Sequence, residues 1–159
     1  MNTSRTERPL PRPAPVGLPR GGQVRRLALF DTRGVVARCR DFTRRALHDW
    51  GWLPAEDAER QAAADDVLLL VSELVTNACL HAGGPQELLL RGTADAVRVE
   101  VSDASPVPPQ PRVPHHPGRP GGHGLHTVAR LSRQWGVTVR EDQSGKSVWL
   151  EVTAPPADR

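Results

Sequence analysis

The sequence lacks the features that would place a protein in a membrane or outside the cell. It has no apolar run long enough to span a bilayer, and residues 1–20 lack the apolar block of a signal peptide. It has only two cysteines, Cys39 and Cys79, and both fall at apolar positions of helical patterns. We therefore expect two small core residues, not a disulfide or a metal pair, in a cytoplasmic protein that makes no membrane contact.

Aromatic residues are scarce as well: the chain has four Trp, two Phe and no Tyr. The net charge of +3 is unevenly spread, because residues 1–26 carry six Arg and one acid whereas the remaining 133 residues carry 15 basic and 17 acidic side chains. The bulk of the chain is thus slightly acidic and has no basic stripe interleaved with aromatics. This pattern argues against direct nucleic-acid binding.

Proline-rich segments divide the chain. Residues 1–22 contain five Pro and no apolar periodicity, so they are predicted to be a disordered tail. One folded domain is expected over residues 23–153, followed by a disordered C-terminus at 154–159. Residues 104–122 hold seven Pro inside the domain. Long irregular segments in compact domains are usually lids or binding loops.

The apolar periodicity predicts an alternation of strands and helices. The predicted strands span residues 23–30, 87–91, 96–103, 135–141 and 147–152. The predicted helices span residues 35–50, 54–81 and 124–134. Asp31 is the expected N-cap of the first helix. Lys146 is expected to be a solvated charge in the last hairpin turn, with a phosphate contact as the less favoured alternative. This order favours an α+β two-layer sandwich, with a mixed, mostly antiparallel sheet and helices on one face.

One predicted helix carries polar side chains at regular spacing. Residues 72–81 read SELVTNACLH, and Glu73, Asn77 and His81 stand four residues apart, so they share one helix face on successive turns. A solvated polar stripe explains such spacing in many amphipathic helices. Taken alone, the stretch leaves this interpretation and a functional site equally open.

Two further polar features follow along the chain. Asp103 ends the predicted strand AVRVEVSD, and GGHGL at residues 121–125 leads directly into a predicted helix. Glycines at a helix start let the backbone approach an anion, and the free helix N–H groups favour negative charge. His115, His116, His123 and His126 lack a nearby Cys or carboxylate to complete a zinc site, so solvated or phosphate-facing roles are favoured over zinc.

The order of E-x-x-x-N on a helix, D at a strand end and G-x-G at a helix start resembles the GHKL family of ATP-binding domains, which includes gyrase and the histidine kinases. The chain looks most like the anti-sigma-factor serine/threonine kinase branch, in its short actinobacterial form. The matching segments are ELVTNACLH (73–81), VEVSDASP (99–106), GGHGLHTVARLSRQWGV (121–137) and GKSVWLEV (145–152). The resemblance covers about residues 24–152 and implies the Bergerat ATP-binding fold.

The resemblance implies ATP and Mg²⁺ as cofactors and suggests roles for individual residues. Asn77 would coordinate the Mg²⁺ that bridges the phosphates, and Glu73 would be the general base. Asp103 would accept a hydrogen bond from the adenine amino group, supported by a hydroxyl from Ser147. The other expected nucleotide-binding residues are Ser105, Gly122, His123, Gly124 and Leu125. The proline-rich segment would be the ATP lid, with Arg112 and Arg119 as its only cations. The chain departs from the wider family at DASPV, where Ser105 and Pro106 replace glycines.

Two functions follow from this resemblance. The first is a kinase that phosphorylates Ser or Thr on a small STAS-type antagonist protein and alternately holds a sigma factor. The second is a non-catalytic, ATP-gated protein-binding module. The presence of Glu73 favours the kinase, because binding alone needs no base. A homodimer is also implied.

Overall fold

The structure is a computed structural model that describes residues 22–31, 33–93, 95–109 and 124–156. The strands are β1 (Gln23–Ala28), β2 (Pro85–Gly92), β3 (Ala96–Asp103), β4 (Gln134–Val139) and β5 (Lys146–Thr153). The helices are α1 (Val35–Asp49), α2 (Ala58–His81) and α3 (Gly124–Leu131). The predicted terminal tails, apart from a few residues at their inner ends, lie outside the described residues, as does most of the predicted lid.

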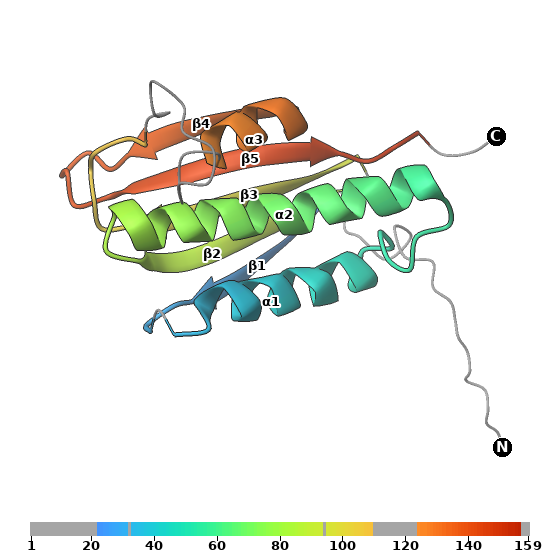
Figure 1. Ribbon diagram of the computed structural model, residues 1–159, viewed down its shortest axis with the longest axis horizontal. Coiled ribbons are helices and arrows are strands. Elements are labelled where there is room, and N and C mark those ends of the chain that lie inside the picture. Colours follow the sequence, from blue (N-terminus) through green and yellow to red (C-terminus); the bar gives the residue numbers. More distant parts are fainter. Residues whose placement is uncertain (1–21, 32, 94, 110–123, 157–159) are drawn as a thin grey trace, which may run out of the picture.

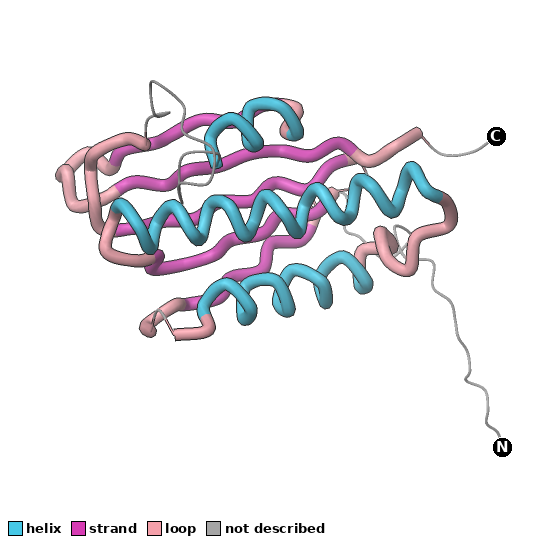
Figure 2. The backbone as a smooth tube through the Cα atoms, in the orientation of Figure 1, coloured by secondary structure: helices cyan, strands magenta, loops and turns pink. Residues whose placement is uncertain are grey.

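The five strands form one sheet in the order β1-β2-β3-β5-β4. All four ladders are antiparallel. Short turns join β2 to β3 and β4 to β5, and such hairpins produce antiparallel pairs. The three helices lie against one face of the sheet (Figures 1 and 2). The two-layer α+β fold is therefore confirmed, and the described sheet is entirely antiparallel where a mixed one was expected.

The core lies between this helical layer and the sheet. α2 runs across the middle of the sheet, with α1 on one side of it and α3 on the other (Figure 1). Alternate residues of β3 point into the core, so Val97, Val99 and Val101 are buried as the sequence pattern predicts. On α2, the predicted core positions Val67, Val71, Leu74 and Ala78 are all buried.

Two helix starts differ from expectation: α2 begins at Ala58, not at residue 54, and α1 has another N-cap than predicted. Asp31 was expected to cap α1, but the cap residue is Gly34, at φ +63°, and Asp31 instead accepts the backbone N–H of Arg33. A short acidic side chain readily closes such a local turn, and this engages the Asp31 carboxylate before the helix begins. Asp57 does cap α2: its side chain accepts the Arg60 backbone N–H, and this bond lowers the pKa of Asp57.

α3 is shorter than predicted. It ends at Leu131, whereas the apolar pattern extended the helix to Gln134. Gln134 already pairs with Glu151 in the ladder between β4 and β5, so pairing in the sheet takes these residues out of the helix. Helix propensity is a weak preference that such tertiary pairing overrides.

The two cysteines are free thiols, as predicted. Cys39 is buried in α1, and burial raises its pKa to about 11; Cys79 is half-buried in α2, and burial raises its pKa too. Both thiols therefore stay protonated at neutral pH.

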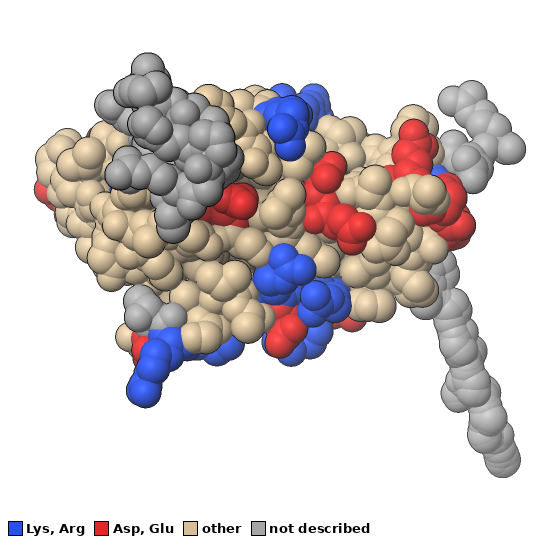
Figure 3. Space-filling view, in the orientation of Figure 1, with Lys and Arg blue, Asp and Glu red and all other residues tan. Residues whose placement is uncertain are grey.

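Within the described residues, no helix has the length and apolar character needed to cross a membrane. Acidic and basic side chains are interspersed on the helical side, without a continuous basic surface in the part described (Figure 3).

Candidate functional site

A cavity of about 360 Å³ lies between the C-terminal half of α2 and the adjoining ends of β3 and β5. Its lining is apolar except for four side chains: Asn77, His81, Asp103 and Lys146. The loop after β3 and the first turn of α3 complete the wall. Ligand sites for small molecules usually combine such apolar walls with a few polar groups that fix orientation.

Asn77, one of the cavity-lining residues, carries an unusual side-chain atom. Its side-chain oxygen Oδ1 is buried and has no hydrogen-bond partner among the described residues. Leaving a buried acceptor unsatisfied costs roughly 1–3 kcal/mol, so such an atom calls for a functional explanation. A neutral amide oxygen is a suitable ligand for the hard cation Mg²⁺. The unpartnered amide oxygen of Asn77 therefore fits the Mg²⁺ that the sequence resemblance implies.

Glu73, Asn77 and His81 share one face of α2 and form a polar stripe, and the other two residues of this stripe differ from Asn77. His81 ends α2 and lines the cavity with an exposed ring. Glu73 lies one turn before Asn77 and is half-buried, but it is not part of the cavity wall. No hydrogen bond or ion pair joins the Glu73 carboxylate to another described residue. The stripe thus runs from the cavity mouth along α2 and reaches beyond the cavity at Glu73.

Asp103 is held in a buried ion pair. Its oxygen Oδ1 accepts the Ser105 backbone N–H at 2.9 Å and the Lys146 ammonium at 3.0 Å. The side chains of Asp103 and Lys146 are only 3% and 5% exposed. Lys146 also donates to the backbone oxygen of Ser105 at 3.1 Å. Ser105 thus fixes both members of the pair through its backbone, and this is its observed contribution to the site.

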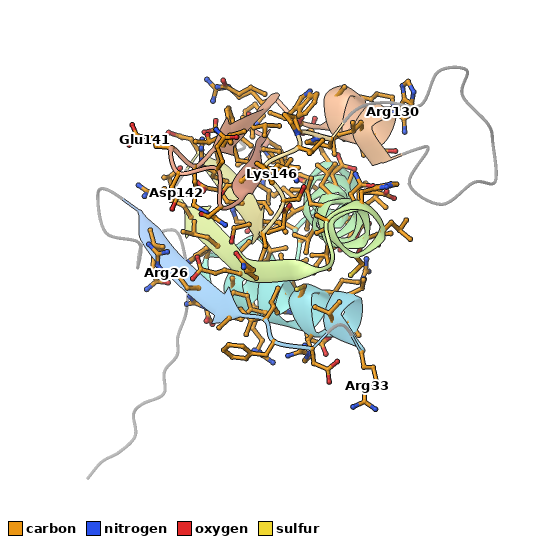
Figure 4. All side chains as sticks on the ribbon, turned by 90° about the vertical axis from the view of Figure 1, so that its left-hand side faces the viewer. Arg26, Arg33, Arg130, Glu141, Asp142 and Lys146 are labelled. Atoms are coloured by element: carbon orange, nitrogen blue, oxygen red, sulfur yellow. The ribbon has the colours of Figure 1, made fainter. Side chains whose placement is uncertain are left out.

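Lys146 lines the cavity, although the sequence predicted a solvated charge. It is the first residue of β5 and stands opposite Asp103 in the ladder with β3, not in the hairpin turn where it was expected to be solvated. Figure 4 shows it inside the domain, whereas Glu141 and Asp142 of the turn lie at the edge. The signal was present: counting back two residues from the buried Val148 places Lys146 on the core face.

The same alternation corrects the expectation for Ser147. Residues alternate between the two faces of a strand, so Ser147 points to the sheet face that carries no helix and pairs with Ser102. Asp103 lies on the opposite, helix-covered face. Ser147 therefore points away from Asp103, and the side chain that contacts Asp103 is that of Lys146.

The turn before Lys146 is locked onto the end of β3. The Arg140 guanidinium donates to the Asp103 backbone oxygen at 2.8 Å and to the Gln86 side chain at 3.1 Å. Gly145 packs directly beneath this contact, where a Cβ would collide with the Asp103 backbone oxygen and with the Arg140 guanidinium. A residue without a side chain is thus required next to Lys146.

This packing leads to a prediction for Gly145→Ala. The variant should lose about 1–3 kcal/mol of unfolding free energy, since the added methyl group overfills a tight contact. Urea denaturation measures the loss. The matched control is Glu141→Ala in the same turn, where an exposed side chain should change stability by less than about 0.5 kcal/mol. A Gly145→Ala midpoint equal to that of the wild type would show that the turn is not constrained in this way.

The expected phosphate-binding residues are described only in part. Gly122 and His123 lie outside the described residues, as do the two arginines of the predicted lid. Gly124 is the first residue of α3, and the following Leu125 is buried and lines the cavity. The start of α3 therefore adjoins the same cavity as Asn77 and Asp103.

Comparison with known proteins agrees with this geometry. A family model described as "Histidine kinase-like ATPase domain" matches residues 31–152. The matched region contains both ends of the cavity, at Asn77 and at the pair of Asp103 and Lys146. No curated protein shows significant similarity to the chain.

Proposed function

Because the chain belongs to the histidine kinase-like ATPase domain family, whose members bind ATP, we propose that it is a Mg²⁺-dependent regulatory kinase of the anti-sigma-factor type. Its substrate is a serine or threonine of a small STAS-type antagonist protein, and it alternately holds a sigma factor. This finer assignment follows the sequence resemblance, as does a homodimeric form. The observation that supports it best is the unpartnered Oδ1 of Asn77 in the wall of a cavity that Asp103 also lines.

In this proposal the cavity holds the nucleotide between its two polar ends. Asp103 accepts a hydrogen bond from the adenine amino group, and Asn77 is the protein ligand of Mg²⁺. Gly124, at the N-terminus of α3, binds the phosphates together with Gly122 and His123, which precede it in the sequence; free N–H groups at a helix start favour anions. When bound, Mg²⁺ neutralises the charge that phosphoryl transfer develops on the phosphate oxygens.

Glu73 is the proposed general base. Its carboxylate takes the proton of the attacking Ser or Thr hydroxyl while that oxygen bonds to the γ-phosphorus of ATP. The bond from the γ-phosphorus to the bridging oxygen breaks, and ADP leaves. Glu73 is half-buried and makes no bond to other described residues, so its carboxylate is available to a partner's hydroxyl.

One observation favours the second function, a non-catalytic ATP-gated binding module. Glu73 does not line the cavity, whereas Asn77 and Asp103 do. In such a module ATP orders the partner-binding surface, and no proton is transferred.

The deciding experiment is a phosphorylation assay with STAS-domain proteins encoded in the same genome, using ATP labelled at the γ-phosphate and Mg²⁺. The kinase predicts label on one Ser or Thr of a partner, identified by mass spectrometry, and labelling that is about 10²–10⁴-fold slower with Glu73→Ala. Partner binding that requires ATP but leaves every partner unlabelled would reject the kinase in favour of the binding module.

A further inference from the structure

The end of the cavity at β3 and β5 offers a hydrogen-bond acceptor and a donor next to each other. The two side chains come from paired positions of adjacent strands, Asp103 and Lys146, and both line the cavity. Lys146 is the only lysine of the chain, in which the other 20 basic residues are arginines. A lysine ammonium is compact and carries three donors, so it fits a buried position where a planar guanidinium would need more room.

The protein uses only part of the bonding capacity of this pair. Both hydrogen bonds that described residues make to the Asp103 carboxylate go to Oδ1. The ammonium of Lys146 donates to Asp103 Oδ1 and to the Ser105 backbone oxygen, which leaves one of its three N–H groups without a partner in the described part of the chain. Oδ2 of Asp103 and one N–H of Lys146 are therefore available to a ligand.

An acceptor beside a donor matches one edge of a particular nucleobase. Adenine carries an exocyclic amino group, a donor, next to ring nitrogens that accept hydrogen bonds. Guanine carries an oxygen at the corresponding position, and this oxygen would face the Asp103 carboxylate.

We propose that Lys146 is a nucleobase-specificity residue, whose free N–H donates to a ring nitrogen of adenine while Asp103 Oδ2 accepts from the neighbouring amino group. The inference rests on the proposed ATP site and adds a second, direct contact to the base. In this inference the Lys146 ammonium, and not the Ser147 hydroxyl that the sequence resemblance implied, acts beside Asp103 at the adenine base. Hydrogen bonds to charged groups are the stronger ones, so the contact should contribute measurably to selectivity.

The test compares ATP with two analogues that each lack one ring nitrogen near the amino group, 1-deaza-ATP and 7-deaza-ATP. Dissociation constants are measured by calorimetry for the full chain and for Lys146→Met, which keeps the side-chain length but removes the donor. The wild type should bind one of the two analogues about 10- to 100-fold more weakly than ATP. Lys146→Met should bind ATP and that analogue equally, within about twofold.

Two further variants keep the test decisive. Lys146→Met leaves the Asp103 carboxylate buried without a countercharge and can fail to fold for that reason. The double variant Lys146→Met/Asp103→Asn then replaces it, because it removes both charges and should likewise not distinguish the analogues. The control is Arg33→Met, which removes an exposed cation that points away from the domain and should preserve the wild-type preference (Figure 4).

The outcomes separate this inference from the proposed function. If the wild type binds ATP and both analogues with equal affinity, or if Lys146→Met still prefers ATP, Lys146 does not contact the base and serves only as a countercharge. The ATP site would then stand without the Lys146 contact. If the wild type binds none of the three nucleotides, the proposed function itself fails and the inference falls with it.

Discussion

Replacing Glu73 with alanine should slow phosphoryl transfer to the partner protein by about 10²–10⁴-fold, the usual loss for a removed general base. ATP affinity should stay within about twofold of the wild type, because Glu73 lies outside the cavity wall. Single-turnover transfer from labelled ATP, together with calorimetric titration, measures both quantities. The matched control is Asp65→Ala, which removes an exposed acid from the same helix and should change neither.

Transfer at the wild-type rate by Glu73→Ala would contradict the kinase mechanism. Under the binding-module alternative, the same variant would keep all ATP-dependent partner binding. If Glu73, Asn77 and His81 form only a solvated polar stripe, Glu73→Ala would change neither ATP affinity, nor phosphoryl transfer, nor partner binding. The comparison with the Asn77 variant separates these two cases.

Asn77→Ala should abolish Mg²⁺-dependent ATP binding. The loss should exceed the about 10–100-fold that follows when only an outer partner of a metal ligand is removed. The free protein, however, should unfold at the wild-type temperature or above it. Alanine removes a buried oxygen that has no partner in the described structure, so the folded state is relieved of an unsatisfied acceptor.

Thermal unfolding with and without ATP–Mg²⁺ measures both effects of Asn77→Ala. Thr76→Ala, at the adjacent position of α2 and outside the cavity wall, is the control and should keep the ATP-dependent shift. An Asn77→Ala variant that ATP–Mg²⁺ still stabilises as much as the wild type would show that the amide is not a metal ligand. A large loss of stability without nucleotide would indicate a structural role instead.

The fold could be predicted from periodicity because its elements obey local rules. β3 alternates strictly from Val97 to Val101 and has the predicted bounds. α2 repeats its apolar residues at helical spacing and ends at His81 as predicted, but it begins at Ala58 and not at residue 54. The errors fall where tertiary contacts override local preference. α3 was extended to Gln134 because the pattern cannot show that this residue pairs with β5. Asp31 was taken as a cap because the sequence does not reveal the turn that engages it.

Part of the candidate site could be predicted from the sequence. The spacing of Glu73 and Asn77 and the position of Asp103 indicated a helix and a strand end, and the structure brings Asn77 and Asp103 to one cavity. The partner of Asp103 could not be found in this way, because a lysine close to a turn is usually solvated. Only the register between β3 and β5 brings Lys146 against Asp103 and turns Ser147 away.

The most direct test of the central claim, that the cavity binds ATP with Mg²⁺ through Asn77 and Asp103, is thermal unfolding of the wild-type protein across a range of ATP concentrations, with Mg²⁺ and with a chelator. A single nucleotide site predicts a stabilisation of about 2.7 kcal/mol when ATP reaches one hundred times its dissociation constant. The stabilisation should be much smaller in the chelator. The absence of any shift at millimolar ATP with Mg²⁺ would contradict the claim.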